Sequence, residues 1–287
     1  IVDGKQVEFR QMWINGVKMR RASTFDDMSM PQIVSVNKSE KTLTIPRPFM
    51  DLSNARHLEM YIPQDWAMNI MRVKEIRHEN EYNSVLSFME DEAEIEFRRP
   101  WPILRADYGS HSNHRFYLSN AIELLNRPQE WYNDIEAGTL YYWPRYGETF
   151  DGIEAIVPRL ETLVNISGKL EQPISNIQFR NITFEHTTWM RPAKNGHVAL
   201  QAGQYLLDAW SENTATANNV AWVGRPSAGV SVQNAKNISF DGCQFRHMGS
   251  TAVDFISGIR NATVNGCVFT DIAGTGVSGG FFGAETF

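Results

Sequence analysis

Two aspartates in the second half of the chain could carry acid–base chemistry. Asp254 lies between two apolar residues in an alternating segment, so we expect its side chain to face outward. Asp271 occupies the same place in a repeated segment as His247, 24 residues earlier. Two carboxyl groups can hydrolyse a glycosidic bond, at about 5–5.5 Å apart with retention and about 6.5–9.5 Å with inversion of configuration. Asp254 and Asp271 are therefore predicted to be catalytic, against the simpler reading of solvated surface residues.

A ladder of side chains is predicted beside Asp271. His186, His247 and Asp271 fill the same position of three aligned segments. Regular stacking of strands would place Asp271 about 5 Å from His247. A neighbouring imidazolium favours the charged form of a carboxyl group and so changes its pKa. We expect both histidines to bind substrate, although histidines in such positions also stack for structural reasons alone.

Aromatic and polar residues between residues 186 and 225 could bind a sugar. The flat, apolar face of a pyranose packs well on an aromatic ring. Trp189, Trp210 and Trp222 are predicted to be such platforms, with His197 and Gln201 as polar contacts to the same substrate. Packing within loops is the alternative for the tryptophans.

An internal repeat must position these residues. Three segments align without gaps, at residues 176–186, 237–247 and 261–271. In each, apolar and polar residues alternate, and the alternation shifts by one at Asn181, Gly242 and Gly266, which marks a bend between two short strands. A further short strand recurs at residues 229–232, 252–255 and 276–279. Three short strands in a repeat of about 24 residues predict an all-β, right-handed parallel β-helix (a solenoid); a sandwich of hairpins is the alternative.

The repeat also predicts the position and the state of the two cysteines. Cys243 and Cys267 occupy the same inward position of consecutive repeats. A disulfide between stacked parallel strands would be strained, so we expect two free, apolar thiols.

The chain is expected to contain two domains. Residues 1–155 show no such repeat, and alternation predicts strands that include 57–62, 69–76 and 84–88, a hairpin turn at Asn15-Gly16 and a short helix over 120–125. This part is predicted to be a β-rich accessory domain, in which the first solenoid strands could also lie. Residues 156–287 are predicted to be the solenoid, with an insertion at 203–225. Because the chain stops in mid-repeat, we expect further coils to follow in the natural protein.

Composition excludes several functional classes. A formal net charge of −6 is not that of a nucleic-acid binder. No apolar run reaches the roughly 20 residues of a membrane-spanning helix. Phosphate-binding loops, zinc-ligand spacings and the Gly-x-Ser-x-Gly elbow are missing from the sequence, and we expect no cofactor.

Several motifs resemble one family. The runs 130–134 (EWYND), 138–145 (GTLYYWPR), 182–189 (ITFEHTTW) and 196–202 (GHVALQA) are similar to those of glycoside hydrolase family 141, and 12–22 and 270–277 resemble the same group. The similarity covers nearly the whole chain, and its single motifs are short.

The resemblance implies a bacterial hydrolase of plant cell-wall glycans, with α-L-fucosidase and xylanase as the known activities. It also implies aspartate catalysts on the face of a β-helix, where Asp254 and Asp271 are the positions that could match. We expect a monomer that binds an oligo- or polysaccharide in the periplasm or outside the cell.

Two other functions compete with hydrolysis. A polysaccharide lyase shares the solenoid fold but pairs a basic residue with Ca²⁺ held by clustered acids. The solenoid part has Lys236, Arg246 and Arg260 but no tight acidic cluster. A non-catalytic glycan-binding solenoid is the other alternative.

Overall fold

The chain is almost entirely β structure, as the repeat predicted. A computed structural model describes residues 7–24, 30–63, 68–90, 114–198, 204–206 and 223–280, and 23 strands lie in that part. The chain divides into two compact units: a first unit of Ile1–Glu8, Ile14–Glu154 and Arg191–Gly224, and a second unit of Phe9–Trp13, Ala155–Met190 and Arg225–Phe287. Of the insertion expected within the solenoid, the described residues 204–206 and 223–224 belong to the first unit.

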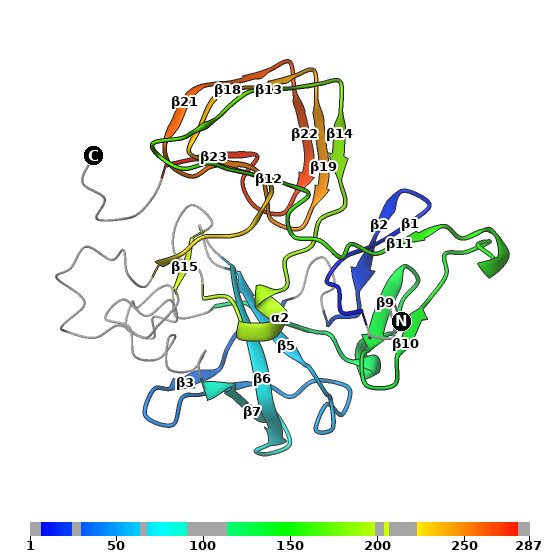
Figure 1. Ribbon diagram of the computed structural model, residues 1–287. Coiled ribbons are helices and arrows are strands. Elements are labelled where there is room, and N and C mark those ends of the chain that lie inside the picture. The colour runs from blue at the N-terminus through cyan, green and yellow to red at the C-terminus, as the bar shows by residue number, and fades with distance from the viewer. Residues whose placement is uncertain are drawn as a thin grey trace. The chain divides into compact units, whose positions relative to one another are not determined.

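The first unit consists mainly of antiparallel strands (Figure 1). Its strands are β2 (Val17–Arg21), β3 (Ser35–Asn37), β4 (Thr42–Pro46), β5 (Glu59–Pro63), β6 (Met68–His78), β7 (Asn83–Phe88), β8 (Tyr117–Ser119), β9 (Glu130–Asp134), β10 (Thr139–Tyr142), β15 (Tyr205–Leu206) and β16 (Val223–Gly224). Six of them form one antiparallel sheet in the order β3-β4-β7-β6-β5-β8. A short helix, α2 (Arg191–Asn195), completes the unit, and no helix in the described residues is long and apolar enough to cross a membrane.

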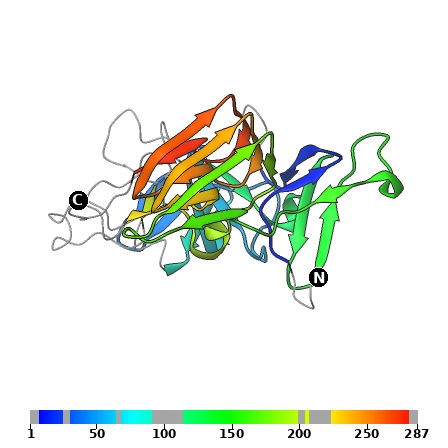
Figure 2. The same cartoon turned by 45° about the horizontal axis from the view of Figure 1, so that its top comes forward.

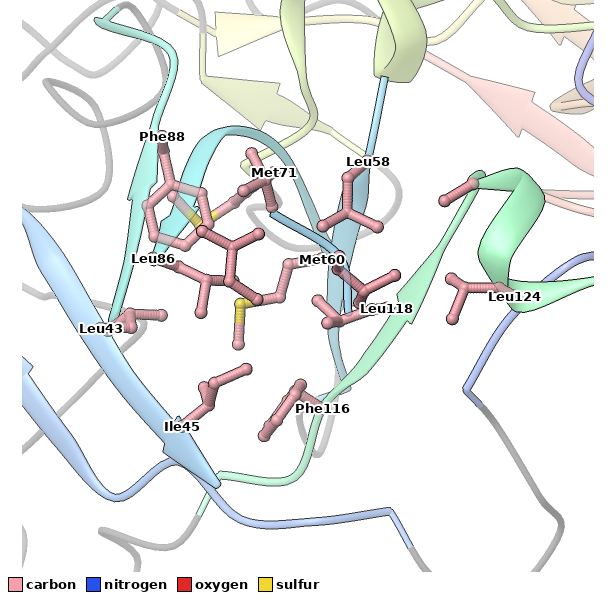
Figure 3. Close-up of a cluster of buried hydrophobic side chains, with 14 of the residues drawn as sticks. Leu43, Ile45, Leu58, Met60, Met71, Leu86, Phe88, Phe116, Leu118 and Leu124 are labelled. Atoms are coloured by element: carbon pink, nitrogen blue, oxygen red, sulfur yellow. The ribbon is translucent and has the colours of Figure 1, made fainter. Parts of the chain in front are cut away.

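The core of the first unit lies on one face of this sheet. Along β6 the buried residues alternate from Met68 to Val73, since successive side chains of a strand point to opposite faces. Leu43 of β4 pairs directly with Leu86 of β7, and both are fully buried. Figure 3 shows these two side chains among apolar side chains that include Met60 of β5, Met71 of β6 and Leu118 of β8. Burial of each large side chain stabilises the fold by roughly 1.5–3 kcal/mol.

The turn expected at Asn15-Gly16 is present, and the expected helix is shorter than predicted. Asn15 and Gly16 both have left-handed backbone conformations, with φ of 50° and 75°, as a two-residue hairpin turn requires. Only Ile122–Leu124 of the predicted 120–125 segment is helical, as a single 3-10 turn. The preceding residue is extended and offers no side-chain cap, so a longer helix has no starting signal.

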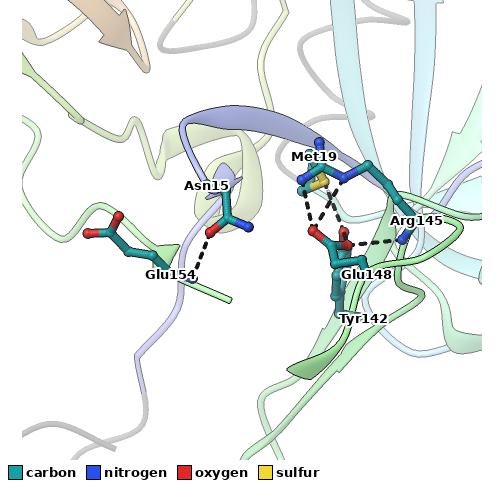
Figure 4. A network of polar contacts seen from close by, with 6 residues as sticks. All are labelled: Asn15, Met19, Tyr142, Arg145, Glu148 and Glu154. Atoms are coloured by element: carbon teal, nitrogen blue, oxygen red, sulfur yellow. Dashed lines mark hydrogen bonds and ion pairs between the residues drawn. The ribbon is translucent and has the colours of Figure 1, made fainter. Parts of the chain in front are cut away.

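A polar network links β10 to the loop that follows it (Figure 4). The Tyr142 hydroxyl donates a hydrogen bond of 2.6 Å to Glu148, and the Arg145 guanidinium donates one of 2.8 Å to the same carboxylate. These donors hold the pKa of Glu148 at about 2. Burial and the adjacent Glu148 carboxylate raise the pKa of Tyr142 to about 12.

The second unit is built mainly of parallel strands. Its strands are β11 (Ala155–Ile156), β12 (Val164–Ser167), β13 (Ile174–Arg180), β14 (Thr183–Glu185), β17 (Ala228–Gln233), β18 (Ala235–Asp241), β19 (Gln244–Met248), β20 (Thr251–Phe255), β21 (Ile259–Asn265), β22 (Val268–Ile272) and β23 (Val277–Gly279), and β1 (Met12–Ile14) lies where the chain passes between the units. Strands from successive repeats form three sheets, β12-β17-β20-β23, β13-β18-β21 and β14-β19-β22. Figures 1 and 2 show these strands side by side, one repeat next to another.

The register of these sheets is the alignment of the repeats. Phe179, Phe240 and Val264 are paired across β13, β18 and β21, so identical positions stack. Phe184, Phe245 and Phe269 form a parallel ring stack with centroids 4.9 Å apart. The cysteines are free, as predicted: Cys243 is buried and Cys267 is half-buried. The inward positions thus build one apolar core.

Residues with a left-handed backbone shape the turns of each repeat. Asn181, Gly242 and Gly266, where the alternation shifts, have φ of 52°, 62° and 58°. Within the strands, asparagines at three aligned positions also have positive φ and bond to one another: Asn237 donates to Asn176 at 2.9 Å, and Asn261 donates to Asn237 at 3.1 Å. Asparagine tolerates this conformation better than other residues with a side chain.

Candidate active site

The predicted ladder of His186, His247 and Asp271 is present in the second unit. His186 directly follows β14, His247 lies in β19 and Asp271 lies in β22, the three neighbouring strands of one sheet. All three residues have a left-handed backbone, with φ of 63°, 58° and 51°. Such a conformation is costly for residues other than glycine and turns each side chain out of the strand alternation. The repeat thus directs three titratable side chains to one edge.

His247 and Asp271 are in direct contact. His247 Nδ1 and Asp271 Oδ2 lie 2.8 Å apart, closer than the stacking distance predicted from the strand spacing. Because an ionised carboxylate can only accept hydrogen bonds, Nδ1 is the donor when Asp271 is charged. The Asp271 side chain is 33% exposed and that of His247 is 19% exposed. The carboxylate is therefore both oriented and accessible.

Trp13 packs against the two histidines. The His186 and His247 rings stack with centroids 5.0 Å apart and an interplanar angle of 22°. The buried Trp13 ring meets His186 edge-on at 4.8 Å and His247 at 5.2 Å, with a tilt of 52°. Sequence reasoning missed Trp13, since no local pattern links it to residues far along the chain.

His186 lies in an environment that disfavours its charged form. Its side chain is 15% exposed, and burial is the main cause of its lowered pKa. The neighbouring His247 and Arg246 lower the pKa further, while Glu185 and Asp271 act in the opposite direction. The buried Nε2 atom has no hydrogen-bond partner within the described part of the chain. His186 is thus a neutral ring in the stack near neutral pH.

A charged pair flanks the ladder. Glu185 and Arg246 occupy the same register position of β14 and β19, and Arg246 Nε donates to the Glu185 carboxylate. Sequence reasoning did not single out Glu185, but the aligned repeats contained the signal: opposite charges stand at one position of adjacent repeats. Within the described residues, no group of three His, Cys, Asp or Glu side chains is arranged to hold a metal ion.

Asp254 has the predicted register but is buried. Its partners on β17 and β23 are Ser231 and Ser278, as the repeat indicated. The alternation predicted an outward side chain, and Asp254 does not belong to the apolar core cluster, yet the residue is only 2% exposed. The Arg225 guanidinium covers it and binds both carboxylate oxygens, through Nε and Nη2. The alternation of a strand predicts on which face of the sheet a side chain lies. It does not predict whether other residues cover that side chain.

The other predicted binding residues fall in three groups. Trp189 is half-buried in the second unit. His197 belongs to the first unit, where its backbone pairs with Ile70 of β6 and its ring packs edge-on against Tyr205 at 5.8 Å. Gln201, Trp210 and Trp222 lie outside the described residues. The structure thus brings together His186, His247 and Asp271, and their functional roles stay predictions.

Comparison with known proteins assigns the family. The sequence model of the GH141 insertion domain matches residues 1–145, about half of the chain. The chain belongs to the GH141 family. A comparison of this GH141 chain with curated proteins gives no match.

A solved structure supports the same relationship. The GH141 chain is similar to a structure titled "Glycoside hydrolase", with 38% sequence identity and a TM-score of 0.87. The match covers 96% of this chain and 49% of the other. The chain therefore spans about half the length of the protein that it matches.

Proposed function

We propose that this GH141 chain belongs to an enzyme that hydrolyses glycosidic bonds in plant cell-wall polysaccharide, with an α-L-fucosidase-like or xylanase-like specificity. Asp271 and Asp254 are the proposed catalytic carboxylates. The observation that carries the proposal is the hydrogen bond between Asp271 and His247, since it orients a carboxylate that is still open to solvent.

The proposed scaffold is a right-handed parallel β-helix. Three parallel sheets, each with one strand from every repeat, support this fold. A stacked face of this kind offers equivalent positions at intervals of about 4.8 Å, along which a sugar chain can lie. The half-buried Trp189 is a proposed aromatic contact for the substrate, with His197, Gln201, Trp210 and Trp222 as further proposed contacts.

The two carboxylates have different environments and hence different proposed roles. Asp271 is accessible and bonded to a group that can itself carry a proton, which suits the transfer of a proton to or from the substrate. Asp254 accepts hydrogen bonds from two nitrogens of the Arg225 guanidinium, Nε and Nη2, which fix the orientation of its carboxylate. Its proposed role is to stabilise the positive charge that develops on the sugar ring during hydrolysis. The proposed enzyme is a monomer that acts in the periplasm or outside the cell.

Activity of the natural, full-length protein tests this function. The protein would be assayed against pectic and xylan oligosaccharides beside Asp271→Asn, Asp254→Asn and the control Asp241→Asn. Asp241 is a half-buried carboxylate of β18 that accepts hydrogen bonds from the side-chain amides of Gln178 and Asn265 and lies outside the ladder. We expect each of the first two variants to lose at least about 100-fold in kcat and the control to match wild type. Full activity in both would show that the catalysts lie elsewhere, and no turnover of any glycan would overturn the hydrolase.

A further inference from the structure

The environment of His247 indicates a role other than substrate binding. One edge of the ring is committed to Asp271, through Nδ1. The His186 ring stacks on one face, with 5.0 Å between ring centroids, and the tilted Trp13 ring lies beside that stack, 5.2 Å from His247. A ring packed in this way has little freedom to rotate, so the direction of its Nδ1–H bond is fixed by the fold.

The charges around His247 and Asp271 are also consistent with a role of His247 other than substrate binding. The titratable groups that face it are His186 and Glu185 from the end of β14 and Arg246 from β19, while the segment 9–13 contributes the apolar Trp13. Arg246 is paired with Glu185, and their charges offset each other. Because His186 is kept neutral by burial, the stacked ring beside His247 adds no positive charge near neutral pH. Asp271 is thus the carboxylate that His247 orients.

The backbone adds a second constraint. His247 and Asp271 both hold a left-handed conformation, with φ of 58° and 51°. At the aligned Asn176, Asn237 and Asn261 positions the chain uses asparagine, which tolerates this conformation. Aspartate and histidine, like asparagine, adopt this conformation more often than other residues with a side chain, so the repeat can turn the side chains of His247 and Asp271 out of the strand alternation.

We infer that His247 is a positioning residue, which holds the carboxylate of Asp271 in the orientation that its reaction requires, within a ring stack supplied by Trp13 and His186. This inference rests on the proposed function of Asp271. A misplaced catalytic group lowers the rate of the chemical step, and a displacement of about 1 Å can cost about 100-fold. Loss of His247 should therefore lower kcat and leave KM nearly unchanged.

Two matched variants test the inference in the full-length protein. In His247→Asn the amide nitrogen takes the place of Nδ1, and asparagine also tolerates the left-handed backbone. In His247→Gln the amide nitrogen lies near the place of Nε2 instead. We expect kcat of His247→Gln to fall about 100-fold, kcat of His247→Asn to stay within about fivefold of wild type, and both KM values to change less than about threefold. Thermal unfolding of both variants shows whether the comparison is between folded proteins.

The outcomes separate this inference from the proposed function. Equal loss of kcat in both variants, or a large rise in KM, would show that His247 contacts substrate and would overturn the positioning role. Full activity of His247→Gln beside an inactive Asp271→Asn would also overturn it and leave the proposed function intact. If Asp271→Asn is as active as wild type, the catalytic role of Asp271 fails and the inference fails with it. If His247→Gln does not fold, rescue by His247→Asn beside an inactive His247→Ala decides the question.

Discussion

Arg225 binds both carboxylate oxygens of Asp254, and only 3% of the Asp254 side chain remains exposed. The same guanidinium donates from Nη2 to Ser278 Oγ at 3.3 Å, so it joins β20 to β23. Two parallel bonds between a guanidinium and a carboxylate are among the strongest side-chain pairs. Arg225, which precedes β17, therefore fixes the orientation of a proposed catalytic carboxylate.

Removal of Arg225 should destabilise the protein because it leaves a buried charge without its partner. We expect Arg225→Met to lower the free energy of unfolding by about 2–4 kcal/mol, since breaking a buried ion pair typically costs 3–5 kcal/mol and Arg225 is 19% exposed. Urea-induced unfolding measures the change. Ser278→Ala, which removes only the 3.3 Å bond, should cost less than about 1 kcal/mol. In the double variant Arg225→Met/Asp254→Leu, part of the loss should be recovered; a purely additive loss would contradict the ion-pair explanation.

The stability of the second unit should depend on pH through His186. Burial lowers the pKa of His186 from its ordinary value of 6.5. Above about pH 6.5 the His186 ring is neutral in both the folded and the unfolded state. Below about pH 6.5 the unfolded chain protonates this histidine more readily than the folded protein does, so the free energy of unfolding decreases as the pH is lowered. We expect His186→Asn to lose less stability than wild type between pH 7 and about pH 5.5, and to show the same pH dependence at about pH 8. Parallel curves from urea unfolding over the whole range would contradict this prediction.

The chain of asparagine side chains should contribute through both its hydrogen bonds and its backbone. Asn237→Gly removes two side-chain bonds but keeps the φ of 55° accessible, so we expect a loss of about 1 kcal/mol. Asn237→Ala loses the same bonds and also the tolerance for a left-handed backbone, which costs about 1–2 kcal/mol more. Chemical unfolding of the two variants separates the contributions. Equal losses would show that the backbone conformation is not a burden at this position.

Glu148 should stabilise the first unit mainly above pH 4.5. Its pKa falls from the ordinary 4.5 to about 2 in the folded protein, chiefly because Arg145 and Tyr142 donate hydrogen bonds to the carboxylate. A lowered carboxyl pKa gives a contribution that is complete above the unfolded value of 4.5 and is lost as the pH falls through about 2. We expect Glu148→Gln to be less stable than wild type at pH 6 and the difference to shrink as the pH is lowered toward 2. A difference that does not change with pH would point to packing instead of charge.

Repeat register could be predicted from the sequence alone. The alignments placed Asp254 beside Ser231 and Ser278, and His247 beside Asp271, and the structure confirms both placements. In stacked parallel strands each position contacts its own equivalent one repeat away, so local spacing contains the long-range pairing. The paired charges of Glu185 and Arg246 were readable by the same rule.

The surroundings of those positions were decided only by the tertiary structure. Trp13 joins the histidine stack from the other end of the chain, and no spacing rule connects them. Asp254 was predicted to face outward and is covered by Arg225, because the path of the segment before β17 determines which side chain lies over the strand. His197 lies close in sequence to the ladder but belongs to the first unit, where it pairs with β6. The periodicity of a sequence specifies which side chains lie on the same face of a sheet. The solvent exposure of those side chains depends on segments outside the repeat, such as those that contain Trp13 and Arg225.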